Sequence, residues 1–118
     1  MLLFAYMAVH KFRLATGPFI AIKSGTKTIE SRLYDEKRQL IKLGDEIIFT
    51  NTSASDQTVT VKVIGLLRYK TFYDLFSHNK LTKFGGESVK KLDNQINEFY
   101  SKEAQNKYGV IGIEFKLL

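Results

Sequence analysis

The sequence predicts an α+β fold, a small β-barrel of about five to six mostly antiparallel strands with about two to three flanking helices. The chain of 118 residues is 44% hydrophobic with a single proline, so it can bury one core and forms a single domain over residues 1–118. Short apolar–polar alternations typical of strands are interrupted by helical patterns, with few places for parallel crossovers. These observations favour a compact barrel over a doubly wound sheet.

The first elements are a strand followed by a short helix. A strand is expected over 9–14, where apolar and polar residues alternate. Thr16, Gly17 and Pro18 provide a helix start, because proline at the first helical position lacks only an N–H that would be unpaired there. Gly25 stands where a left-handed C-terminal cap is needed, so the helix has about two turns.

The segment 26–33, TKTIESRL, is expected to be a strand with an unusual polar face. Ile29 and Leu33 lie on one face, while Glu30 and Arg32 lie on the other with Thr28. A carboxylate and a guanidinium two positions apart on one strand face can form an ion pair, which would hold the carboxylate in a fixed direction.

The middle of the chain predicts a hairpin. After a charged turn or short helix, Gly44 and Asp45 mark a tight turn before an apolar strand over 46–50. Residues 51–57, NTSASDQ, have the composition of a hairpin loop, and a long alternating strand follows over 58–69. Gly65 inside that strand indicates a bulge or a sharp bend.

After Thr71 the apolar period changes to that of helices. Thr71 caps a short helix, and Gly85 and Gly86 break the chain before a second one. The final segment, 108–118, returns to strand. The expected apolar face of the second helix is formed by Val89, Leu92, Ile96 and Phe99.

Composition excludes several kinds of site. The chain has no cysteine, which excludes disulfides, thiolate metal sites and a cysteine nucleophile. His10 and His78 lie far apart without flanking carboxylates, so no metal site is expected. No cofactor motif is present, and we expect no cofactor.

The apolar start MLLFAYMAV lacks the basic residues that precede a secretory signal and is shorter than the roughly 20 residues of a membrane span. We expect a strand or ordered leader, no membrane association and a cytoplasmic protein. Met1 and Met7 are both possible natural starts.

The formal charge of +6 is unevenly distributed. Residues 23–42 carry six basic and three acidic residues and residues 62–91 carry seven and two, whereas residues 43–61 carry three acidic and no basic residues. This pattern suits a polyanion groove if folding joins the two basic segments, but a solvated lysine-rich surface would have the same charge.

One motif carries a family resemblance. The run GTKTIESR at 25–32 has the pattern Gly-x-Lys-Thr-x-Glu-x-Arg and is followed by DEKR at 35–38 and KLGD at 42–45. Their order resembles the ASCH domain, named for homology to the activating signal cointegrator. Further points of likeness are Pro18-Phe19, the long strand ending near Tyr69, Thr71-Phe72, Phe99-Tyr100-Ser101 and Tyr108-Gly109-Val110.

The resemblance implies a PUA-like barrel with a cleft where this motif meets the barrel mouth, and RNA or modified bases as ligands. One similar branch, the acetylcytidine amidohydrolases, uses a lysine, a threonine and a glutamate. Lys27 matches that lysine, but Glu30 stands at the threonine's place, and Glu87 is the nearest candidate for the glutamate.

Two main functions follow, and both use the same cleft. The first is binding of RNA or of a modified nucleoside or nucleotide, with Arg38, Arg68 and Lys70 as phosphate contacts. The alternative is a small hydrolase acting on a modified nucleoside or on RNA, with Lys27 and Glu30 as catalytic residues. The predicted nucleic-acid-binding residues are Lys27, Thr28, Glu30, Arg32, Arg38, Arg68, Tyr69 and Lys70.

Other interpretations of these residues remain open. Glu30 and Arg32 also suit an ion-paired surface patch, and Tyr34 and Tyr69, although available to stack on bases, also suit core or rim packing. A protein partner is a third possibility, for which an apolar patch within residues 1–6 would be the sign.

Overall fold

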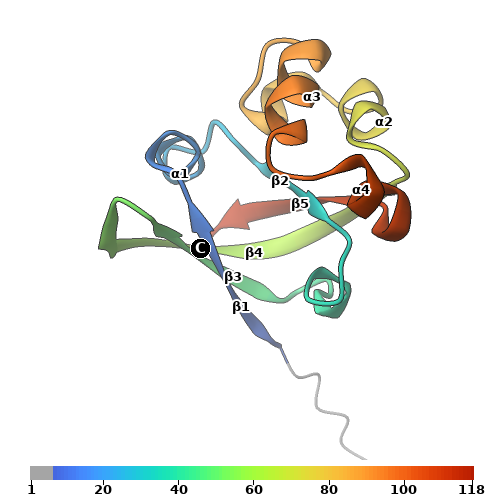
Figure 1. Cartoon of the computed structure of the whole chain (residues 1–118). Helices are drawn as coiled ribbons and strands as arrows, with labels where there is room; N and C mark the ends of the chain where they lie inside the picture. Colours follow the sequence, from blue (N-terminus) through green and yellow to red (C-terminus); the bar gives the residue numbers. More distant parts are fainter. Residues whose placement is uncertain (1–6) are drawn as a thin grey trace, which may run out of the picture.

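The computed structural model describes residues 7–118 as one curled, mixed sheet with helices around it (Figure 1). In this part of the chain the strand order is β1-β3-β4-β5-β2, and only β1 and β3 run parallel, so the α+β prediction is confirmed. The strands are β1 (Val9–Leu14), β2 (Ile29–Leu33), β3 (Glu46–Asn51), β4 (Ala54–Tyr69) and β5 (Val110–Leu117). The helices are α1 (Thr16–Lys23), α2 (Phe72–Ser77), α3 (Val89–Asn97) and α4 (Lys102–Tyr108), with 3₁₀ turns η1 (Arg38–Leu40) and η2 (Leu81–Phe84).

The sheet is a half-barrel whose two edge strands, β1 and β2, are linked by side chains instead of a strand ladder. Arg32 Nη2 donates to the carbonyl oxygen of Arg13 at 3.1 Å. Beyond the end of β2, Lys37 Nζ donates to the carbonyl oxygen of Lys11 in β1 at 3.3 Å. Because Arg32 bridges the two edge strands, its guanidinium is held in place beside the end of β1.

Apolar side chains pack on both faces of the sheet. On one face Phe49 contacts Phe12 and Phe115, with ring centroids 5.8 and 5.6 Å apart. On the other face lies a second buried cluster, which includes Phe72 of α2, Phe84 of η2 and Val110 at the start of β5. These two clusters fix α1 and the α2–α3 region on either side of β2.

Several local predictions are confirmed. Gly25 follows α1 with a φ of 83°. The pairing of β4 with β5 shifts register between Val63 and Gly65, as expected for a bulge. The Thr71 hydroxyl accepts from the backbone N–H of Asp74 at 3.1 Å and so caps α2.

Other predictions differ from the structure. The expected loop 51–57 is mostly strand, because β4 already begins at Ala54 and the side-chain amides of Asn51 and Gln57 bond across the hairpin at 3.1 Å. Residues 7–118 contain four α-helices, one more than the upper expectation, because the polar helix α4 has no apolar stripe and depends on its Ser101 cap.

Phe99 was expected on the apolar face of the second helix, and this is wrong. Helix α3 ends at Asn97, and Phe99 is 77% exposed. The remaining apolar residues of α3 do pack against the second core cluster. The apolar patch considered within residues 1–6 lies outside the described residues.

Candidate functional site

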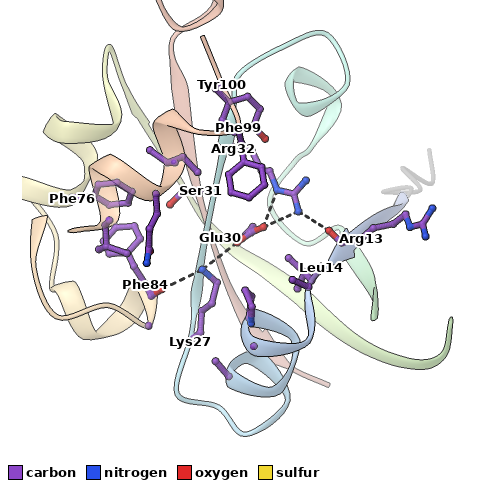
Figure 2. Close-up of a pocket in the computed structure, with 18 residues that line it drawn as sticks. Arg13, Leu14, Lys27, Glu30, Ser31, Arg32, Phe76, Phe84, Phe99 and Tyr100 are labelled. Atoms are coloured by element: carbon purple, nitrogen blue, oxygen red, sulfur yellow. Dashed lines mark hydrogen bonds and ion pairs between the residues drawn. The ribbon is translucent and has the colours of Figure 1, made fainter. Parts of the chain in front are cut away.

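The motif residues meet at an open cavity of about 600 Å³ that is lined by residues of α1, β2, η2 and α3 (Figure 2). Gly25, with a φ of 83°, turns the chain after α1, and the backbone N–H groups of Thr26 and Lys27 donate to the Ala21 carbonyl oxygen, so the segment that leads into β2 stays beside that helix. Lys27, Glu30 and Arg32 therefore lie along one wall, with Arg13 and Leu14 from the end of β1 beside them.

The carboxylate of Glu30 is the centre of the polar wall. Glu30 is only 7% exposed. Its Oε1 lies 3.2 Å from Lys27 Nζ, and its Oε2 accepts from Arg32 Nε and lies 2.8 Å from Arg32 Nη2. Burial acts to raise the pKa of this carboxyl, but the neighbouring ammonium and guanidinium outweigh burial and hold the pKa below its usual value. Glu30 is therefore an ionised hydrogen-bond acceptor at neutral pH.

Lys27 reaches this wall from outside the strand. Strand β2 begins at Ile29, so strand alternation does not fix the direction of Lys27. Its Nζ lies between Glu30 and the carbonyl oxygen of Phe84, to which it donates at 3.2 Å. Figure 2 shows this chain of contacts running from η2 through Lys27 and Glu30 to Arg32 and the Arg13 carbonyl.

The opposite wall is apolar and aromatic. Leu92 and Ile96 of α3 line it together with Phe84. Phe99 and Tyr100, just after α3, also line the cavity, and Tyr100 stacks on Phe72 with the ring centroids 5.7 Å apart. A cavity with one charged wall and one aromatic wall fits a flat ligand that has apolar faces and a polar edge.

The sequence predicted the charged wall but missed the aromatic one. Arg13 and Phe99 were not among the predicted site residues. No sequence pattern marked Arg13 as a site residue, because its position beside the cavity depends on how the end of β1 packs against β2. For Phe99 the signal was its presence in the family-like run Phe99-Tyr100-Ser101.

Three further predicted residues do not line this cavity. Arg38 pairs with Asp35 at 2.7 Å and lies over the Phe12 ring at 5.3 Å. The backbone N–H of Thr28 donates to the Lys83 carbonyl oxygen at 2.8 Å and so ties the start of the motif strand to η2. Glu87 is exposed and is not a lining residue either.

The structure places Arg68, Tyr69 and Lys70 at a separate groove of about 550 Å³, where β4 ends beside α4 and the start of β5. Arg68 lies over the Tyr34 ring with its Cζ 3.9 Å from the centroid. Tyr69 stacks on His78 at 5.7 Å. The expected basic rim is thus divided between two regions.

Metal ligands do not gather in residues 7–118, where no group of three or more His, Asp or Glu side chains is suitably placed. His10 instead bonds Asp45 at 2.8 Å, and the backbone N–H groups of Ala8 and Lys42 donate to the same carboxylate. Over the same range, every helix is too short or too polar to span a membrane.

Comparison with known proteins gives consistent matches. The model of the ASCH domain family matches residues 14–118. A hypothetical protein, PH0355, has a crystal structure that aligns with a TM-score of 0.83 at 34% identity, covering 93% of this chain and 99% of that one. The solution structure of protein PF0455 from Pyrococcus furiosus aligns with a TM-score of 0.74 at 32% identity, covering 93% and 97%.

A more distant match is the crystal structure of ASCH from Zymomonas mobilis, with a TM-score of 0.59 at 17% identity, covering 92% of this chain and 66% of that one. At that identity the likeness concerns the fold. The search of curated proteins found no match.

Proposed function

This chain belongs to the ASCH domain family, and from that premise we propose that it binds RNA or a nucleotide, with a base entering the cavity beside Lys27, Glu30 and Arg32. The family is generally associated with RNA binding. The observation that carries the proposal is the buried Glu30 carboxylate, held between two cations on one wall of a cavity whose other wall is aromatic.

The chemistry of the two walls matches a nucleobase. A base presents hydrogen-bond donors and acceptors on its edge, and it has two flat faces that stack on aromatic side chains. Glu30 accepts hydrogen bonds, while Lys27 and Arg32 donate them, so the charged wall can pair with both kinds of group on a base edge. Phe99 is 77% exposed at the aromatic wall and is available for stacking.

A ligand screen tests this proposal. Binding of nucleosides, nucleotides and short RNAs is measured by thermal shift and calorimetry, with the wild type and Lys27→Ala. The matched control is Lys23→Ala, an exposed lysine at the end of α1 that does not line the cavity. We expect binding by the wild type and the control and its loss in Lys27→Ala. Circular dichroism checks that the variant is folded, and Arg32→Lys provides a second, milder change to the same wall.

Either of two results would refute the proposal. One is wild-type protein that binds none of these ligands. The other is binding that survives unchanged in both Lys27→Ala and Arg32→Lys, since the cavity would then not be the site.

The same contact supports a second candidate, a hydrolase acting on a modified nucleoside or on RNA. Lys27 Nζ and Glu30 Oε1 are 3.2 Å apart inside the cavity, close enough to act on one substrate. Binding is the stronger proposal, because a carboxylate with a lowered pKa is a weak general base and the threonine of the amidohydrolase pattern is replaced by Glu30. Turnover by the wild type that is lost in both Lys27→Ala and Glu30→Gln, with the fold retained, would favour the hydrolase.

A further inference from the structure

The groove at the end of β4 is a second basic site with a different charge balance from the first. Its lining includes Arg68, Lys70 and Lys107 and no carboxylate. In the motif cavity, by contrast, Glu30 neutralises part of the positive charge. Excess cations that line a concave surface favour an anionic ligand.

The polar groups around these cations are suited to oxygen atoms of a phosphate. Asn106 of α4 lines the groove, and its exposed side-chain amide can donate to a phosphate oxygen, whereas the amide of Gln105 already donates to Asn97 and Tyr100. Lys70 and Lys107 are both exposed. The turn that closes the groove is tight: Gly109 has a φ of 71°, and a Cβ there would lie 3.2 Å from the Tyr69 carbonyl oxygen. The close approach of α4 to the end of β4, also visible in Figure 1, keeps the cations from both elements together.

The sheet links this groove to the motif cavity. Arg32 and Arg68 both pair with Ile111, from its two sides, so the three residues form one row across β2, β5 and β4. Directly paired residues project from the same face of a sheet, and two strand spacings of about 4.8 Å place the arginine backbones about 10 Å apart. A continuous strand of nucleic acid can bridge this separation.

We propose that the groove formed by Arg68, Lys70 and Lys107 binds the phosphodiester backbone of a single RNA strand whose base occupies the motif cavity. This inference rests on the proposed function and makes it more specific, because the ligand is then an oligonucleotide. The groove contributes charge-assisted contacts that tighten binding without reading the sequence.

The test compares two double variants that remove the same charge from different places. Lys70→Ala/Lys107→Ala alters the groove, while Lys90→Ala/Lys91→Ala removes two exposed lysines of α3 that line neither cavity. All four side chains are exposed, so both proteins should fold. The probe is a fluorescein-labelled single-stranded RNA of about 12 nucleotides, titrated between about 50 and 200 mM salt.

The groove variant should bind this RNA at least about tenfold more weakly than the wild type, because two contacts to charged groups are lost. The slope of log K against log salt should fall by about 1.4, since each phosphate contact on a single strand contributes about 0.7. The α3 control should keep the wild-type affinity and slope. Any mononucleoside that binds the wild type should bind the groove variant equally well, because the base cavity is unaltered.

Equal losses in the two double variants would overturn the groove proposal in favour of non-specific attraction, and unchanged binding in both would also overturn it. In either case retained RNA binding that depends on Lys27 would leave the proposed function standing. Wild-type protein that binds no RNA and no nucleotide would overturn both.

Discussion

Replacing Glu30 by Gln should strongly destabilise the protein at neutral pH. The substitution keeps the shape of the side chain but removes the negative charge that lies 3.2 Å from Lys27 and 2.8 Å from Arg32. The Lys27 and Arg32 side chains are only 12% and 15% exposed, so water replaces little of the lost interaction. Removing one partner from a buried ion pair costs about 3 kcal/mol, the lower end of the usual range, because both cations keep some contact with solvent.

That loss corresponds to a decrease in Tm of about 12 °C for a domain of this size. Urea unfolding at pH 7 measures it directly. Glu114→Gln is the matched control, because Glu114 pairs with Lys83 at 3.0 Å but the Lys83 side chain is 46% exposed. An exposed pair of this kind contributes less than about 1 kcal/mol, so the control should stay close to the wild type.

The cost of Glu30→Gln should also depend on pH. The pKa of Glu30 lies below its ordinary value of 4.5 in the folded protein, so its ionised form stabilises the fold at pH values above 4.5. This stabilisation is lost as the pH falls through the folded pKa, and the difference between wild type and variant should then narrow. Equal costs for Glu30→Gln and Glu114→Gln, or a cost that is the same at neutral and acid pH, would refute this account of the buried cluster.

Three further outcomes are expected. Phe99→Ala should change the free energy of unfolding by less than about 0.5 kcal/mol, because the ring is 77% exposed. It should weaken RNA binding by about 1 to 3 kcal/mol in a calorimetric titration, and an unaltered affinity would contradict stacking on this ring. Asp45→Ala should lower the free energy of unfolding in urea by about 3 kcal/mol, since it removes the acceptor of His10 and of two backbone N–H groups. A decrease below about 1 kcal/mol would show that these hydrogen bonds contribute little to stability. Gly112→Ala should lower the free energy of unfolding by about 1 to 3 kcal/mol in the same assay, because a Cβ would lie 2.8 Å from Leu75 Cδ1. A variant as stable as the wild type would show that the Leu75 side chain can move to make room for the added methyl group.

The predicted fold class was correct because it depends on local patterns. Alternation of apolar residues identified β1 and most of β4, and Thr71 and Gly25 marked helix ends through backbone rules that act within a few residues. Where no apolar stripe exists, as in α4, the same approach failed. A short polar helix is stabilised by its cap and its tertiary contacts, which a periodic pattern does not contain.

The charged part of the candidate site could be inferred from the sequence, because Glu30 and Arg32 are two positions apart and a strand places them on one face. The burial of that pair, the path by which Lys27 reaches it and the presence of Phe99 in the same cavity are seen only in the folded chain. The folded chain also places Arg68 and Lys70 in a separate groove beside Lys107. The reason is physical: burial, desolvation and the convergence of distant charges depend on how strands and helices pack, which no short stretch of sequence specifies.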